Sequence, residues 1–124
     1  MKTYDWEQIK ADEITGLYSR KVVLGDNVTV ARLEVKKGAA TRMHSHPNEE
    51  IIVVLEGRWR FFLASEQVTL EANQMLRIPP GAVHGSEVLE DVVAIDVCSP
   101  ARPDWVHGED RSLHYDPEQY LWAV

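Results

Sequence analysis

Short apolar segments separated by turn residues recur along most of this 124-residue chain. They are rich in Val, Ile and Leu, and no segment before residue 100 keeps the 3.6-residue period of a helix. Because many short strands joined by Gly, Pro and Asn turns are typical of sandwiches and closed barrels, we predict an all-β fold. The expected strands are 21–24, 28–35, 51–55, 58–63, 68–70, 75–78, 88–89 and 92–97.

Two pairs of these strands have the spacing of β-hairpins. Glu56-Gly57 separates 51–55 from 58–63, and Glu90-Asp91 separates 88–89 from 92–97. We therefore predict a hairpin turn at each of these dipeptides.

The chain has the length of a single domain, 1–124, with a modest core. We divide it into a lead-in (1–20) on the edge of the domain, a barrel core (21–98) and a C-terminal extension (99–124). The extension is expected to be an irregular tail that either packs on the barrel exterior or a partner subunit, or forms a lid over a pocket. Its aromatic and histidine residues include Trp105, His107, His114, Tyr115, Tyr120 and Trp122, and neither histidine is expected to bind a metal.

Charge and cysteine content narrow the class of protein. Acidic residues outnumber basic ones by 20 to 13, so the chain lacks the basic surface that nucleic acid or an anionic membrane requires. No apolar run is long enough to span a bilayer. Cys98 is the only cysteine, which leaves no disulfide within the chain. The first ten residues lack the apolar segment of a signal peptide, and we expect a cytoplasmic protein.

His44-x-His46 is a candidate metal-binding pair, because residues two apart on a strand share a face. Glu50 follows after a short turn, and His84 follows the tight Pro79-Pro80-Gly81 turn. Three imidazoles and one carboxylate suit Fe, Mn, Ni, Co, Cu or Zn, and do not suit Ca or Mg. With four protein ligands, octahedral geometry leaves two positions open, as in a catalytic site. The alternative is that these are surface or capping histidines.

The spacing of these residues resembles the two cupin motifs. Gly38-x5-His44-x-His46-x3-Glu50-x6-Gly57 is similar to the first, and Asn73-x5-Pro79-x-Gly81-x2-His84 resembles the second. Asn73 stands where glycine is usual, and Val88 where asparagine is frequent. The resemblance covers about residues 20–98 and implies a cupin-type β-barrel, a double-stranded β-helix or jelly roll, that binds one divalent transition metal ion. Cupins commonly pair through exposed edges, so we also expect a homodimer.

Residues 95–105, IDVCSPARPDW, together with the HSHP-x-EE and VLEG segments, resemble the KdgF-type cupins of pectin and alginate breakdown. Those proteins open the ring of 4,5-unsaturated monouronates to give linear 5-keto-4-deoxyuronate. The resemblance implies a metal-dependent enzyme with Asp96 and Arg102 as catalytic residues, Asp96 to move a proton and Arg102 to hold the carboxylate of an anionic small-molecule substrate. Cys98 replaces a pocket phenylalanine, and Glu50 stands where glutamine is frequent.

The strand pattern adds two further candidates for substrate binding. Cys98 shares a strand face with Asp96, so both point inward if either does. Arg60 is a second anion anchor if its face, rather than that of Trp59 and Phe61, lines the cavity. Asp96 is alternatively a buried partner of an arginine, such as Arg60 or Arg77.

Other functions remain open at this point. The same ligands serve iron or copper in dioxygenases and related oxidoreductases. A cyclase or isomerase of secondary metabolism is another possibility, and a non-catalytic small-molecule-binding module is a third.

Overall fold

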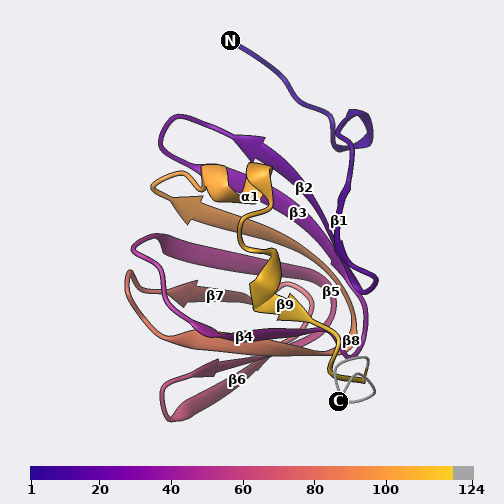
Figure 1. Cartoon of the computed structure of the whole chain (residues 1–124), viewed down its shortest axis with the longest axis vertical. Helices are drawn as coiled ribbons and strands as arrows, with labels where there is room; N and C mark the ends of the chain where they lie inside the picture. Colours follow the sequence, from indigo (N-terminus) through magenta and orange to yellow (C-terminus); the bar gives the residue numbers. More distant parts are fainter. Residues whose placement is uncertain (119–124) are drawn as a thin grey trace.

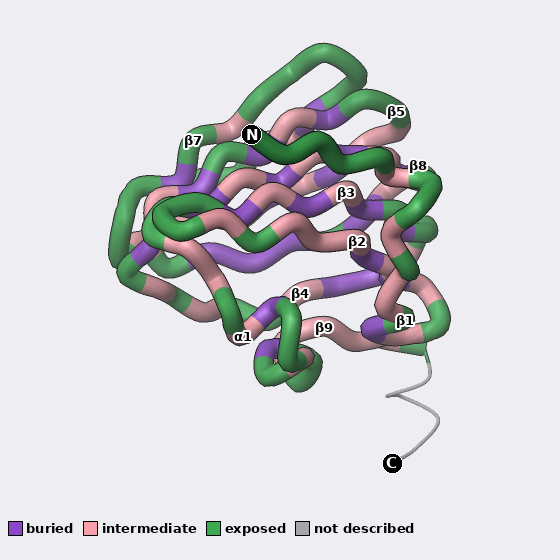
Figure 2. Tube along the Cα trace, turned by 90° about the horizontal axis from the view of Figure 1, so that it is seen from above, coloured by how far each residue is buried: buried purple, intermediate pink, exposed green. Residues whose placement is uncertain are grey.

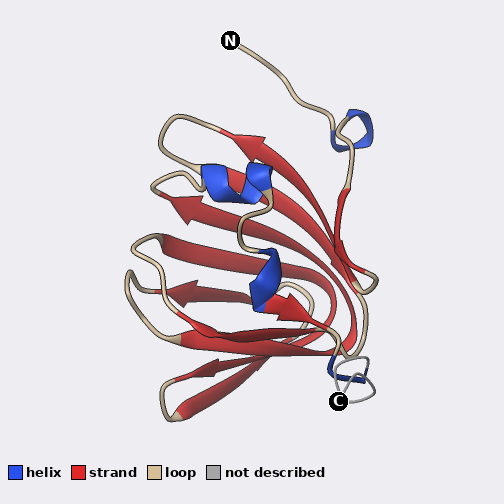
Figure 3. Cartoon of the chain, in the orientation of Figure 1, coloured by secondary structure: helices blue, strands red, loops and turns tan. Residues whose placement is uncertain are grey.

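The computed structural model describes residues 1–118, and Tyr120 and Trp122 lie outside the described residues. Strands make up nearly all of the regular structure (Figures 1 and 3). The elements are η1 (Trp6–Gln8), β1 (Asp12–Thr15), β2 (Tyr18–Leu24), β3 (Thr29–Val35), β4 (Ala40–His44), β5 (Glu49–Leu63), β6 (Glu66–Leu70), β7 (Met75–Ile78), β8 (His84–Ser99), α1 (Pro103–His107), η2 (Arg111–Leu113) and β9 (His114–Tyr115).

Two long strands, β5 and β8, join the two layers of one nearly closed, barrel-like sheet. The first half of β5 pairs with the second half of β8, and β1, β2, β3 and β7 extend this layer. The second half of β5 pairs with the first half of β8, and β4, β6 and β9 extend the other layer. Figure 1 shows both strands curving from one layer into the other. The all-β barrel prediction is confirmed.

The two predicted hairpin turns are wrong, because Glu56-Gly57 and Glu90-Asp91 lie inside β5 and β8. The register of the pair shifts between Val54 and Trp59, which marks β-bulges where both strands bend. Gly57 has φ +93°, and a Cβ there would collide with the carbonyl oxygen of Asp91. A glycine inside a strand often marks such a close approach of two backbones. The turn-forming residues therefore bend two paired strands instead of ending them.

The bulge in β5 changes which residues of that strand face inward. Before it, Glu50, Ile52 and Val54 are buried. After it, buried residues take odd numbers, and Trp59 and Phe61 are each 3% exposed. Simple alternation along the strand would have turned the even-numbered residues inward throughout. Figure 2 shows buried residues alternating mainly with intermediate ones along the central strands.

Both ends of the described chain are more ordered than expected. The lead-in contains η1, β1 and the start of β2, and its Ile14 and Tyr18 belong to the hydrophobic core. The extension is not irregular: it forms α1, η2 and β9, and β9 pairs with β4. Within residues 1–118, no helix has the length and apolar character needed to cross a membrane.

Candidate metal centre

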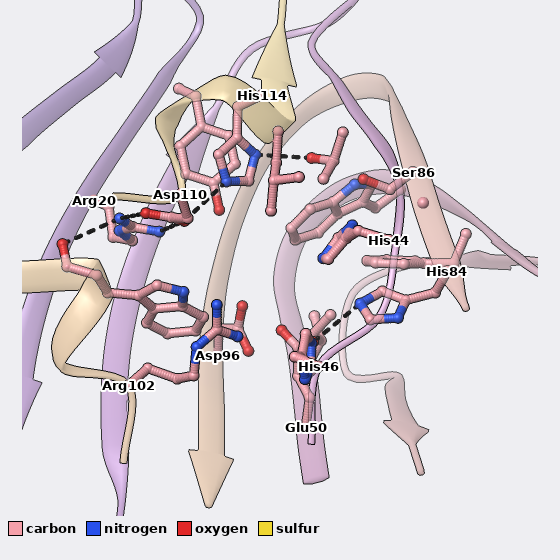
Figure 4. Close-up of a pocket in the computed structure, with 18 residues that line it drawn as sticks. Arg20, His44, His46, Glu50, His84, Ser86, Asp96, Arg102, Asp110 and His114 are labelled. Atoms are coloured by element: carbon pink, nitrogen blue, oxygen red, sulfur yellow. Dashed lines mark hydrogen bonds and ion pairs between the residues drawn. The ribbon is translucent and has the colours of Figure 1, made fainter. Parts of the chain in front are cut away.

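Three histidines converge at one end of the barrel (Figure 4). His44 ends β4, His84 begins β8, and the two are partners in the β4–β8 register. His46 lies in the loop after β4, where its carbonyl accepts a hydrogen bond from the Gly81 N–H at 2.8 Å. One ring nitrogen from each histidine lies within 4.8 Å of the other two. The predicted trio is therefore brought together by the β4–β8 ladder and by the turn before β8.

Backbone carbonyls fix how these rings are oriented. His44 Nδ1 lies 2.6 Å from the Arg42 carbonyl, and His84 Nδ1 lies 2.9 Å from the Ala82 carbonyl. His46 Nδ1 lies 3.1 Å from the carbonyl of Asn48. We assign a proton to each Nδ1, because a carbonyl oxygen only accepts hydrogen bonds. Nε2 of His46 and of His84 then donates to Glu50 only while its ring is cationic, and each Nε2 offers the lone pair of a metal-binding histidine once it carries no proton.

Glu50 supplies the predicted carboxylate. Its Oε1 lies 3.1 Å from His46 Nε2 and 3.4 Å from His84 Nε2, and the residue is 6% exposed. Burial alone would raise the pKa of Glu50, but hydrogen bonds with His46 and His84 outweigh it and hold this pKa well below its usual range. Conversely, burial would lower the pKa of His84, and the hydrogen bond to Glu50 raises it overall. Glu50 is thus an ionised carboxylate whose oxygen can serve as a metal ligand beside the imidazoles.

These four side chains fit a divalent transition metal ion. Two ligands at right angles, each about 2.1 Å from one ion, are roughly 3.0 Å apart. The separations of 3.1 and 3.4 Å between Glu50 Oε1 and the two Nε2 atoms are close to that value. Three imidazoles and a carboxylate also have the donor chemistry expected for such an ion.

The four candidate ligands form one wall of a cavity inside the barrel. The inner faces of β2, β5 and β8 form further walls, and the extension closes another side. Besides the four candidate ligands, the lining includes Tyr18, Arg20, Thr41, Ile52, Trp59, Phe61, Ser86, Asp96, Arg102, Trp105, Asp110, Leu113 and His114. Of the two expectations for the tail, its described part agrees with a cover over the pocket.

Asp96 lies in this cavity next to Glu50. Burial, followed by the negative charge of Glu50, raises the pKa of Asp96 well above its usual value. Its Oδ1 is buried and has no hydrogen-bond partner among the described residues. The proposed pairing with Arg60 or Arg77 is wrong: Arg77 pairs with Glu49 at 2.6 Å, and Arg60 Nη1 lies 3.9 Å from Glu87.

Arg102 also lines the cavity, and its guanidinium is held in place by its neighbours. Nε and Nη2 donate to the two carboxylate oxygens of Asp104 at 2.9 and 2.7 Å, and the group stacks over the Trp105 ring. Its backbone N–H donates to Thr29 Oγ1 at 2.6 Å. The structure thus places both predicted catalytic residues, Asp96 and Arg102, at the same cavity.

The two other predicted substrate contacts do not reach the cavity. The bulge at Gly57 turns Trp59 and Phe61 inward, which leaves Arg60 on the outer face of β5. Cys98 does share the inward face with Asp96, but it is 0% exposed and is not part of the cavity lining. The small thiol is packed in the core behind the cavity wall, and burial raises its pKa.

A buried polar network that the sequence interpretation missed ties the extension to the barrel. Arg20 donates to both carboxylate oxygens of Asp110, at 2.7 and 2.8 Å, and to the Trp105 carbonyl at 3.2 Å. His114 Nε2 lies 3.2 Å from the Asp110 carboxylate, and its Nδ1 lies 2.9 Å from Thr41 Oγ1. An arginine at a core-facing position of a strand is unusual, and this is the signal that could have revealed Arg20.

Comparison with known proteins settles the family. The profile of the cupin domain matches residues 31–98, more than half of the chain. The protein is a cupin. None of the curated proteins matches this cupin in sequence.

Several solved structures share this fold. KdgF from a Halomonas species superposes with a TM-score of 0.78 at 22% identity, over 84% of this cupin and 99% of that chain. An RmlC-like cupin from Shewanella frigidimarina gives a TM-score of 0.77 at 25% identity, over 82% and 93%. A variant of Bacillus subtilis oxalate decarboxylase gives 0.70 at 16% identity, over 78% of this cupin but 29% of that longer chain. The fold is shared, and the reaction must be argued from the site.

Proposed function

We propose that this cupin is a metal-dependent enzyme that opens the ring of 4,5-unsaturated uronate monosaccharides to give 5-keto-4-deoxyuronate. The observation that carries the proposal is the position of Asp96: its buried Oδ1 has no hydrogen-bond partner within residues 1–118, and the residue lines the same cavity as the four candidate ligands. The resemblance of residues 95–105 to KdgF-type cupins and the structural likeness to KdgF support the choice of substrate.

The reaction transfers one proton within the substrate and needs no oxidant. The hydroxyl on C1 loses its proton, and a C1 carbonyl forms as the bond from C1 to the ring oxygen breaks. The electrons of that bond pass to the ring oxygen and leave an enolate over C4 and C5. Protonation of C4 then gives the C5 ketone. Substrate and product are isomers, so an acid–base residue and stabilisation of the enolate are sufficient.

His44, His46, Glu50 and His84 would hold the metal ion, which supplies Lewis-acid stabilisation of a developing oxyanion. Asp96 accepts the hydroxyl proton at Oδ1 and returns a proton to C4. Its burial and the neighbouring Glu50 charge make its carboxylate more basic than an exposed one.

Arg102 would bind the substrate carboxylate. Asp104 accepts hydrogen bonds from Nε and Nη2 of its guanidinium, and Cys98 also interacts with the group. A guanidinium carries five N–H donors, so donors remain for a carboxylate. Because Asp104 and the Trp105 ring already orient the group, little side-chain entropy is lost when substrate binds.

The test is a spectrophotometric assay of the metal-loaded protein with an unsaturated monouronate, following loss of the ultraviolet absorbance of the double bond. We expect turnover without oxygen uptake, and a fall in kcat of roughly 10²- to 10⁴-fold for Asp96→Asn. Arg102→Lys should raise KM, whereas Arg60→Lys, on the outer face, should not. A rate equal to that of buffer would refute the proposal. Oxygen consumption would instead indicate a dioxygenase, and tight binding without turnover a binding module.

A further inference from the structure

Three unpaired polar atoms in the core belong to residues of one cavity. Among the described residues, four buried side-chain nitrogen or oxygen atoms lack a hydrogen-bond partner, and three of them are Arg20 Nε, Trp59 Nε1 and Asp96 Oδ1. All three residues line the cavity beside the metal centre. The fourth, Arg58 Nε, lies outside that lining, within 3.2 Å of a Glu71 carboxylate oxygen. Buried polar groups in folded proteins are almost always paired, so their gathering at one site indicates a ligand that pairs them.

Arg20 presents its Nε–H in a fixed position. Its Nη1 and Nη2 atoms donate hydrogen bonds to the Asp110 carboxylate, and Nη2 also donates to the carbonyl of Trp105. The central carbon of the guanidinium lies 4.9 Å from the centre of the Trp105 ring. The residue is 1% exposed, so its Nε–H does not reach bulk solvent. Nε is therefore an oriented donor with no acceptor among the described residues.

Trp59 provides a second donor from a different strand. It follows the bulge in β5, is 3% exposed, and its ring centre lies 4.7 Å from that of Phe61. The indole N–H is the only polar group of this side chain, and an indole nitrogen only donates. A buried tryptophan usually finds a partner for this group.

Figure 4 shows Arg20 and Asp110 on one side of the cavity and the candidate metal ligands on the other, with Asp96 between them. A ligand held at the metal centre therefore extends towards Arg20 past Asp96. It must offer acceptor oxygens to two N–H donors and an O–H group to Asp96 Oδ1. Hydroxyl groups supply both functions, whereas an apolar ring of the same size leaves all three atoms buried and unpaired.

We infer that Arg20 and Trp59 are specificity-determining residues that select a small, hydroxyl-rich acid and reject apolar acids of similar size. The inference rests on the proposed function in that its ligand enters the same cavity and approaches the same metal centre. It goes beyond that proposal by assigning recognition to two residues that neither bind the metal nor move the proton.

The test measures the preference of the metal-loaded protein for D-galacturonate over cyclohexanecarboxylate, a ring acid without hydroxyls, by isothermal titration calorimetry. Trp59→Phe removes the N–H donor and part of the indole but keeps an aromatic ring, and it is matched by Trp6→Phe in η1. Arg20→Lys removes Nε–H and keeps the charge, and is matched by Arg58→Lys, outside the cavity lining. Circular dichroism establishes that each variant is folded; if Arg20→Lys does not fold, Trp59→Phe carries the test.

We expect D-galacturonate to bind at least tenfold more tightly than cyclohexanecarboxylate. Trp59→Phe and Arg20→Lys should each reduce that preference about fivefold, the usual effect of one lost hydrogen bond. The matched variants should keep the full preference. Equal binding of the two acids, binding of neither, or an unchanged preference in Trp59→Phe would overturn the inference. If the preference is observed but an unsaturated monouronate is not turned over, the proposed reaction fails and the inference stands.

Discussion

Replacing Asp110 with alanine should strongly destabilise this cupin, because it leaves the buried Arg20 cation without its carboxylate partner. The Arg20 and Asp110 side chains are 1% and 4% exposed, and their closest atoms are 2.7 Å apart. After Asp110→Ala, the Trp105 carbonyl is the one acceptor that the described part of the chain leaves to Arg20. Breaking a buried ion pair by removing one partner costs about 3–5 kcal/mol, a large share of the roughly 5–15 kcal/mol that stabilises an ordinary domain.

The free energy of unfolding from urea denaturation measures this loss directly. Glu49→Ala is the matched control, because the Glu49–Arg77 pair is as short, at 2.6 Å, but its side chains are 43% and 59% exposed. An exposed pair of this kind is worth about 0–1 kcal/mol. Similar losses for the two variants, or a loss below about 1 kcal/mol for Asp110→Ala, would refute the assignment of stability to burial of the pair.

The same pair makes a pH-dependent contribution. Burial would raise the pKa of Asp110, but hydrogen bonds from Arg20 and His114 hold it well below its usual range. Because the folded-state pKa is depressed, the stabilisation is complete above the unfolded carboxyl pKa of about 4 and is lost as the pH falls below it. The difference in unfolding free energy between wild type and Asp110→Ala should therefore shrink below pH 4. A difference that grows on acidification would contradict this reasoning.

Gly57→Ala should lower the free energy of unfolding in urea by more than about 3 kcal/mol, because its new Cβ would collide with the Asp91 carbonyl oxygen. Gly38→Ala is the control, since Gly38 has the same φ of +93° but no atom within 4 Å of the added Cβ. It should cost only the backbone strain of about 1–2 kcal/mol. Equal costs would argue against the close contact at the bend. Cys98, fully buried and with a raised pKa, should resist a thiol reagent in the native protein and react in urea; rapid native labelling would show that the core opens there. Glu50→Gln keeps an oxygen ligand but removes the charge, so metal affinity should fall roughly 10- to 100-fold in a competition titration and fall further for Glu50→Ala. An unchanged affinity in Glu50→Ala would exclude Glu50 from the site.

Local spacing was sufficient to predict that His44, His46, Glu50 and His84 lie close together. His44 and His46 lie on one side of a short turn, and the turn before His84 brings β8 alongside β4. These relations depend on a few consecutive residues and on β-strand geometry, which sequence conveys well. The all-β class follows in the same way, whereas Asp96 was selected through the resemblance to KdgF-type cupins.

The errors come from long-range effects. Glu56-Gly57 resembles a hairpin turn in isolation, and only the presence of a continuous partner strand makes it a bulge. That bulge shifts the alternation of β5 and places Arg60 outside. Arg20 and Asp110 are 90 residues apart in sequence, and their pairing depends on how the extension folds over β2. No local pattern reports such a contact.

The most direct test of the central claim is elemental analysis of purified protein supplied with transition metals and then freed of excess ions. The account predicts one tightly held divalent ion per chain, much reduced occupancy for His84→Ala, and full occupancy for His107→Ala, whose imidazole is exposed in the extension. No retained ion in the wild type, or the same occupancy in His84→Ala, would contradict a metal centre built from His44, His46, Glu50 and His84.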